Sequence, residues 1–229
     1  MLLINTCKIT LKQLLTASFI LSSSLMTFSA AAQSKPDTTK VQPEVVVTEH
    51  RARINDKKIN YQAIAGETIL EDSKGAPLAS IFSISYLRTD VKNAEKRPVT
   101  FVFNGGPGSA SLWLHMGIFG PKRVVVPGDA TDDGAAPYPL IENEYSMLDE
   151  SDLVFIDPVG TGFSRALGEK KGADFWGVKE DAKSIAEFMR RWLIEHGRWN
   201  SPKYLAGESY GTTRAAALVD ELQGGWTDI

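Results

Sequence analysis

The sequence has one cysteine, no excess of positive charge and no long apolar run beyond its N-terminal segment. Its single cysteine, Cys7, lies in an N-terminal segment that we expect to be removed, so the mature chain has no disulfide and no thiol chemistry. The chain has 25 basic and 28 acidic residues and no clustered positive patch, which excludes a nucleic-acid-binding surface. After residue 32 no stretch is long and apolar enough to span a membrane.

Residues 1–32 have the pattern of a secretory signal peptide. Lys8 and Lys12 precede an uncharged, mainly apolar run that ends in small residues at Ala30–Ala32, as a cleavage site requires. An uncleaved membrane anchor is the alternative, and the many serines and threonines of the run favour cleavage. We therefore expect a periplasmic or secreted protein with no membrane contact after cleavage, and the absence of cysteine favours the periplasm. Without this segment 23 basic and 28 acidic residues remain, a net charge near −5.

The rest of the chain divides into a short lead-in and one domain. Residues 33–44 are polar, contain two prolines and predict a disordered lead-in. Residues 45–87 alternate between apolar and polar side chains, which predicts antiparallel strands with one wetted face. Residues 128–139, rich in Gly, Pro and Asp, predict a long loop.

The second half of the chain has the pattern of an α/β sheet protein. Val99–Phe103 and Leu153–Ile156 are continuous apolar runs, as expected of strands that are buried on both faces. Lys203–Ala206 predicts a third buried strand, and Val178–His196 predicts an amphipathic helix. These elements predict an α/β fold with a mainly parallel sheet and an antiparallel N-terminal section.

Gly207–Gly211 reads G-x-S-x-G between a predicted strand and an Ala- and Leu-rich predicted helix that ends at Gly224–Gly225. This context is that of a nucleophile elbow, in which the hydroxyl of Ser209 is exposed on a sharp turn at a helix N-terminus. Gly207 and Gly211 allow the close approach of strand and helix that such a turn needs. The same pattern also occurs by chance, and the flanking strand and helix favour the elbow.

Two glycine-rich stretches follow the apolar strands. Asn104–Ser109 lacks the Gly-Lys-Ser/Thr ending of a phosphate loop, and Arg165 occupies the third glycine position of a dinucleotide fingerprint that starts at Gly160. We interpret Gly105–Gly106 as an oxyanion-hole loop, since a backbone without side chains can direct an N–H at a developing oxyanion. The second donor is expected to be the amide of Tyr210.

Three sequence blocks together resemble those of the serine carboxypeptidases: Asn104–Ser109, Asp157–Ser164 and Gly207–Gly211. The resemblance covers roughly residues 98–222 and implies an α/β-hydrolase fold, no cofactor and no metal, and the removal of C-terminal residues from peptide or protein substrates. It implies that Ser209 is the nucleophile and that the amides of Gly106 and Tyr210 form the oxyanion hole. Asn104 and Glu208 would bind the terminal carboxylate, and a carboxyl group can do so only when it is protonated.

The chain departs from this pattern in ways that bear on activity. Ile118 stands where relatives carry an acidic partner for the Glu208-type carboxyl, which puts an acidic pH optimum and a strict preference for free C-termini in doubt. In α/β-hydrolases the Asp and His of the triad follow the serine, yet His50, His115 and His196 all precede Ser209. His196 ends the long predicted helix and fits a capping role, and His115 is the alternative base.

These departures lead us to expect that residues 45–229 are the N-terminal part of a hydrolase domain, with the downstream Asp and His of the triad lacking from this chain. Two alternatives remain open on the sequence alone. One is a non-catalytic fragment or vestigial binding protein, and the other is an acyltransferase or esterase on the same scaffold, because different acceptors can share one acyl-enzyme.

Overall fold

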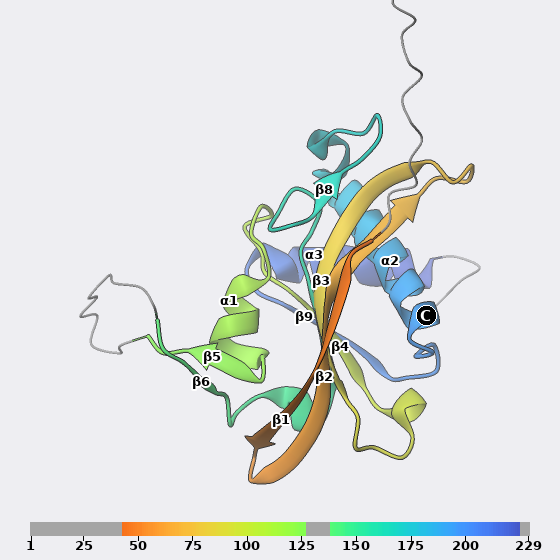
Figure 1. Ribbon diagram of the computed structural model, residues 1–229. Coiled ribbons are helices and arrows are strands. Elements are labelled where there is room, and N and C mark those ends of the chain that lie inside the picture. The colour runs from red at the N-terminus through yellow and green to blue at the C-terminus, as the bar shows by residue number, and fades with distance from the viewer. Residues whose placement is uncertain (1–42, 127–137, 225–229) are drawn as a thin grey trace, which may run out of the picture. The chain divides into compact units, whose positions relative to one another are not determined.

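The computed structural model describes residues 43–126 and 138–224 of the chain (Figure 1). The predicted signal peptide, most of the predicted lead-in and most of the predicted loop at 128–139 lie outside the described residues, as does Gly225. No helix in the described part of the chain is long and apolar enough to cross a membrane.

The elements follow the predicted order of strands, loops and helices. The strands are β1 (Val45–Ile54), β2 (Lys57–Glu71), β3 (Pro77–Arg88), β4 (Val99–Phe103), β5 (Lys122–Val124), β6 (Leu140–Glu142), β7 (Asp152–Ile156), β8 (Arg165–Ala166) and β9 (Lys203–Gly207). The helices are α1 (Leu112–Leu114), which continues into a π-helical turn over His115–Phe119, α2 (Val178–Glu195) and α3 (Tyr210–Gln223). Short 3-10 turns lie at Ala94–Lys96, Met147–Asp149 and Gly172–Phe175.

One mixed sheet organises the described residues, with its strands in the order β1-β2-β3-β7-β4-β9. The strands β1, β2, β3 and β7 pair antiparallel, whereas β4 pairs parallel with both β7 and β9. This is the predicted antiparallel section joined to a parallel section. A tight turn joins β2 to β3, where the Asp72 carboxylate accepts hydrogen bonds from the N–H groups of Lys74 and Ala76, at 2.8 and 2.9 Å.

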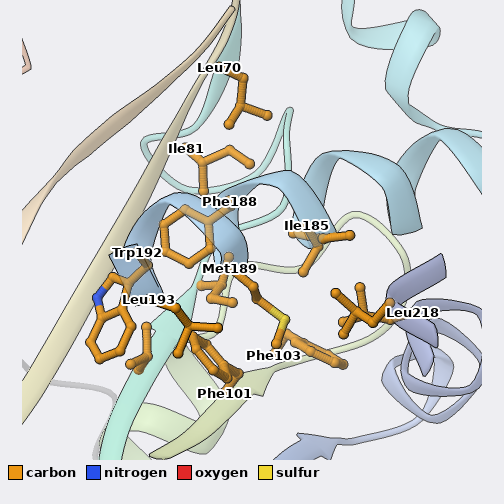
Figure 2. Packing of buried hydrophobic residues seen from close by; sticks show 14 of the residues in the cluster. Leu70, Ile81, Phe101, Phe103, Ile185, Phe188, Met189, Trp192, Leu193 and Leu218 are labelled. Carbon is orange, nitrogen blue, oxygen red and sulfur yellow. The ribbon is translucent and has the colours of Figure 1, made fainter. Parts of the chain in front are cut away.

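The central strands are buried on both faces, as their continuous apolar runs predict. Phe101 and Phe103 point to the face that α2 and α3 cover, where they pack with the apolar stripe of α2 (Figure 2). Val154 belongs to the same cluster. Their neighbours Val102 and Phe155 point to the opposite face and pack with residues of β1, β2 and α1. Burying one such side chain stabilises the fold by roughly 1.5–3 kcal/mol. The sheet therefore has helices against one face and the β1–β2 ribbon with α1 against part of the other.

The prediction of a wetted face in the N-terminal section is wrong for β3. Ser83 and Ser85 are 7% and 1% exposed, and they share a face of β3 with Ala79 and Ile81, which pack with residues of α2. The indole N–H of Trp192 on α2 donates a hydrogen bond of 3.0 Å to the Ser85 hydroxyl. A serine that binds a helix side chain has the same period-two pattern as one that faces water, so alternation could not separate the two.

The prediction that Lys203–Ala206 is a buried strand is also wrong. Within the described residues β9 is the outermost strand of the parallel section, and none of its residues is fully buried. Tyr204 is 57% exposed. The expected helix after the serine is present as α3, and its C-cap Gly224 has φ −95°, so the left-handed glycine cap that often ends a helix is not used.

Candidate active site

Ser209 lies on a sharp turn between β9 and α3, as the G-x-S-x-G pattern predicts. It is exposed and has φ 57° and ψ −123°, a region that residues other than glycine enter at a cost of roughly 1–3 kcal/mol. A Cβ on Gly207 would overlap the carbonyl group of Gly211, and a Cβ on Gly211 would lie 2.9 Å from the carbonyl oxygen of Phe103. Both glycines are therefore needed for the close packing of β4, β9 and α3 that holds the turn in its strained form.

Asn104–Ser109, which we call the oxyanion loop, follows β4 and packs directly on this turn. Gly105 is buried against the backbone of Glu208, Tyr210 and Gly211, where a Cβ would find no room. Gly106 has φ 57°. Among the described residues, the N–H groups of Gly106 and Tyr210 donate to no protein acceptor, and that of Tyr210 lies at the N-terminus of α3, where the helix dipole favours negative charge.

Asn104 and Glu208 meet beside Ser209. The Asn104 side-chain amide donates a hydrogen bond of 3.3 Å to the Glu208 carboxylate, and its oxygen accepts one of 3.0 Å from the N–H of Leu114. Asn104 is buried at 1% exposure, whereas Glu208 is exposed. The amide is therefore held rigidly, and the carboxyl group is free to meet a ligand.

A surface pocket joins these groups. It is lined by Asn104, Gly105, Gly106, Ser109, Trp113, Leu114, Ile118, Glu208 and Ser209. Trp113 and Ile118 are 71% and 54% exposed, and they give the pocket an apolar rim. Ile118 stands where an acid was expected, so among the described lining residues Glu208 is the only carboxylic acid.

None of the three histidines, all of which are described, lines this pocket. The alternative base His115 is 8% exposed, stacks on Phe155 and shares a hydrogen bond of 2.7 Å between its Nε2 and the Tyr86 hydroxyl. Burial lowers the pKa of His115 to about 4. His196 is the C-cap of α2, the role that the sequence predicts, and His50 lies on β1. The structure therefore offers Ser209 no histidine within this chain.

The block Asp157–Ser164 supports the oxyanion loop from the side. The Asp157 carboxylate accepts a hydrogen bond of 2.8 Å from the N–H of Ser111, just beyond that loop. Burial raises the pKa of Asp157, although hydrogen bonds from the N–H groups of Ser111 and Phe163 oppose the rise. The Ser164 hydroxyl donates to the carbonyl of Asp157 at 2.6 Å and accepts from the N–H of Phe82 at 2.7 Å. The block therefore supports the site through hydrogen bonds and does not line the pocket.

Two charged residues next to the site were missed at the sequence level. Arg214 on α3 and Asp181 on α2 are buried and form an ion pair of 2.7 Å, and Arg214 also contacts the oxyanion loop. A signal for them exists in the sequence: Asp181 interrupts the apolar stripe that continues at Ile185 and Phe188, and Arg214 lies in an Ala-rich helix. An acid on the buried face of a helix needs a partner of opposite charge.

A strained serine between a strand and a helix, next to a glycine loop at the end of a neighbouring parallel strand, is the arrangement found in proteins of the α/β-hydrolase fold. The family follows from comparison with known proteins. The serine carboxypeptidase family model matches residues 84–225, and the chain belongs to that family.

Individual relatives agree with this assignment. Serine carboxypeptidase-like 9 of Arabidopsis thaliana is 31% identical over 146 residues, which are 63% of this chain and 32% of that protein. Serine carboxypeptidase-like 5 of the same plant is 33% identical over 144 residues, 61% of this chain and 31% of that protein. The chain thus spans about a third of the length of the curated relatives that it matches.

A solved structure shows the same arrangement of elements. KEX1(delta)p, a prohormone-processing carboxypeptidase from Saccharomyces cerevisiae, is 25% identical with a TM-score of 0.58. The match covers 74% of this chain and 36% of that one.

Proposed function

We propose that the protein is a serine-type carboxypeptidase that hydrolyses C-terminal peptide bonds through an acyl-enzyme on Ser209. The observation that carries the proposal is one pocket that joins the strained Ser209, Gly106 and the Asn104–Glu208 pair, with the N–H of Tyr210 directly after Ser209 in the chain. A nucleophile and an oxyanion hole serve any acyl transfer. A hydrogen-bonded carboxyl and amide beside them supply the additional group that selects a free C-terminus.

Each group of the pocket has a part in this reaction. The Ser209 oxygen attacks the carbonyl carbon of the last peptide bond, and the amides of Gly106 and Tyr210 donate to the oxyanion that forms. Collapse of this intermediate releases the C-terminal amino acid and leaves an ester on Ser209, which water then hydrolyses. Asn104 and a protonated Glu208 donate to the substrate carboxylate and set which bond lies against the serine.

The proton of Ser209 needs an acceptor, since a serine hydroxyl is a weak nucleophile at neutral pH. No histidine lines the pocket, and none follows Ser209 in the sequence. We place the base and its carboxylate partner outside these 229 residues, in the part of the protein that corresponds to the remainder of its relatives.

The test uses the protein as its gene encodes it and an N-blocked dipeptide with a free C-terminus. We expect release of the C-terminal amino acid, slower cleavage of the matching dipeptide amide, and a loss of about 10⁴–10⁶-fold in kcat for Ser209→Ala. Turnover that survives in Ser209→Ala would overturn the proposal.

Two further arms separate the alternatives. If esters react at Ser209 and dipeptides do not, the scaffold serves as an esterase, and transfer to an added amine or alcohol in preference to water identifies an acyltransferase. Binding of the dipeptide without any Ser209-dependent product would indicate the non-catalytic alternative.

A further inference from the structure

We propose that Arg214, paired with Asp181, is a positioning residue that holds the oxyanion loop in register with Ser209; this inference rests on the function proposed above. The Arg214 guanidinium donates from Nη1 to the carbonyl oxygen of Asn104 at 2.6 Å and from Nη2 to that of Pro107 at 3.1 Å. These two carbonyls lie on either side of Gly105–Gly106.

The placement of Arg214 in the chain makes it suited to this task. It lies on α3, the helix whose N-cap is Ser209, so one rigid element carries both the nucleophile and the group that fixes the loop. Contact of Gly105 with the backbone of Tyr210 fixes the loop from the other side. The position of the Gly106 N–H relative to Ser209 is thus determined by two contacts to the same helix.

The guanidinium itself is held on all sides. Arg214 is 1% exposed, its Nε donates to the Asp181 carboxylate at 2.7 Å, and its Cζ lies 5.6 Å from the ring centre of Phe103 and 5.2 Å from that of Tyr210. The guanidinium has its donors on three nitrogens in a planar fork, so it can reach a carboxylate and two carbonyls that lie around that plane, whereas a lysine ammonium has its three donors on a single nitrogen.

A stabilising role alone does not account for this arrangement. A buried ion pair often adds little stability compared with an apolar pair of similar volume, because both charges lose their hydration. Two of the three hydrogen-bonded contacts of Arg214 go to the oxyanion loop and one goes to α2. A link between the helices needs only the contact to Asp181, and Arg190 already donates from α2 to the carbonyl of Glu221 on α3 at 3.2 Å.

Arg190 therefore provides the matched control. Like Arg214, it joins α2 to α3, but it has no hydrogen bond to the oxyanion loop. Arg190→Lys replaces a guanidinium with an ammonium between the same two helices, as Arg214→Lys does, but away from the site. The test compares it with Arg214→Lys, and with the double variant Asp181→Leu/Arg214→Met, which removes both buried charges and so avoids leaving one of them unpaired.

The first readout does not depend on activity. The N–H groups of Gly108 and Ser109 donate to carbonyls within the loop, so their hydrogen exchange reports whether the loop holds its shape. Measured on the protein as its gene encodes it, Arg214→Lys and the double variant are expected to speed this exchange by about tenfold or more, the effect of one lost hydrogen bond. Arg190→Lys leaves it unchanged.

The second readout is kcat for the blocked dipeptide per folded molecule, with the folded fraction taken from the unfolding curve of each variant. We expect Arg214→Lys to lower kcat by about 10- to 100-fold, because a small displacement of an oxyanion donor has that effect. A merely structural role would lower the folded fraction and leave kcat per folded molecule unchanged.

The two readouts keep the two proposals apart. Unchanged exchange of Gly108 and Ser109 in both Arg214 variants overturns the positioning role, whatever the activity. Parental kcat per folded molecule in Arg214→Lys overturns it as well. Accelerated exchange in a protein whose parent form cleaves no dipeptide supports the loop-holding role and refutes the proposed function instead.

Discussion

Gly105 lies so close to Tyr210 that a Cβ on Gly105 would overlap the backbone nitrogen of Tyr210. This contact joins the oxyanion loop to the first residue of α3, the helix whose N-cap is Ser209. We expect Gly105→Ala to push the two apart, to destabilise the fold by about 1–3 kcal/mol and to lower kcat by on the order of 10²-fold.

Gly108 offers a control on the same loop. Its φ is not positive, and a Cβ there would meet the Gly106 carbonyl oxygen at 3.5 Å, an ordinary van der Waals distance. Gly108→Ala should therefore change unfolding free energy and kcat much less than Gly105→Ala. Equal effects of the two substitutions, measured by denaturant unfolding and dipeptide turnover, would mean that the Gly105 contact does not set the geometry.

The second prediction concerns Glu208 and pH. A protonated Glu208 can donate a hydrogen bond to the substrate carboxylate, and an ionised Glu208 repels it. KM for a free-acid dipeptide should therefore rise with pH, by roughly ten- to a hundredfold if a hydrogen bond to a charged group is lost. Glu208→Gln should flatten the rise, since an amide donates at any pH.

The dipeptide amide is the control substrate for this experiment, because it has no carboxylate for Glu208 to bind. Its KM should be the same in the parent and in Glu208→Gln at every pH. A Gln variant that keeps the parental pH profile for the free acid would remove Glu208 from the proposed carboxylate site.

The third prediction concerns His115 and the stability of the fold in acid. Acid should weaken the fold, whereas it should strengthen binding of the free-acid substrate. Burial lowers its pKa to about 4 in the fold, below the ordinary value of 6.5, and burial raises the pKa of its partner Tyr86, which therefore stays neutral and offers His115 no counter-charge. Between pH 6.5 and 4, the His115 imidazole therefore binds a proton in the unfolded chain but not in the folded chain. Stability is complete above about pH 6.5 and falls as pH decreases toward 4, by on the order of 3 kcal/mol in full.

The measurement is unfolding free energy against pH for the parent protein and for His115→Gln, whose amide can still hydrogen-bond the Tyr86 hydroxyl. The Gln variant should lose much of the decline between pH 6.5 and 4. A variant as acid-sensitive as the parent would assign the decline to other groups.

The sequence predicted the order of the elements and the identity of the site better than it predicted burial. The G-x-S-x-G elbow and the two apolar central strands are local patterns with local causes, and the structure contains them where expected. Burial of Ser83 and exposure of Tyr204 depend on which elements pack against each strand. The residues of the strand itself do not reveal those neighbours.

The residues of the site also divide into those that local patterns indicate and those that only packing brings together. Asn104 and Glu208 were paired through family resemblance, and the structure brings them to 3.3 Å. Arg214 and Asp181 lie 33 positions apart on two helices and belong to no motif, so the acid in the apolar stripe of α2 indicates that a partner is needed but not that the partner is Arg214. The contact arises from the packing of α2 on α3, which only the folded chain shows.

The last prediction concerns residues 33–229 expressed alone. We expect no turnover of a blocked dipeptide, because no histidine lines the Ser209 pocket and the oxyanion hole alone retains only a small part of the rate. We also expect association, since β9 is the outer strand of the described sheet and its Tyr204 is 57% exposed. An uncovered strand edge pairs readily with another chain.

The monomer fraction is measured by sedimentation for this segment and for Tyr204→Lys, whose charge on the edge strand should raise it. Turnover is measured beside Ser209→Ala. A soluble monomer whose turnover disappears in Ser209→Ala would show that a base within these residues serves the serine. His115 would then have to leave the Tyr86 hydroxyl, to which its Nε2 is now hydrogen-bonded at 2.7 Å, and reach the pocket from its buried position, so His115→Gln would abolish the same turnover.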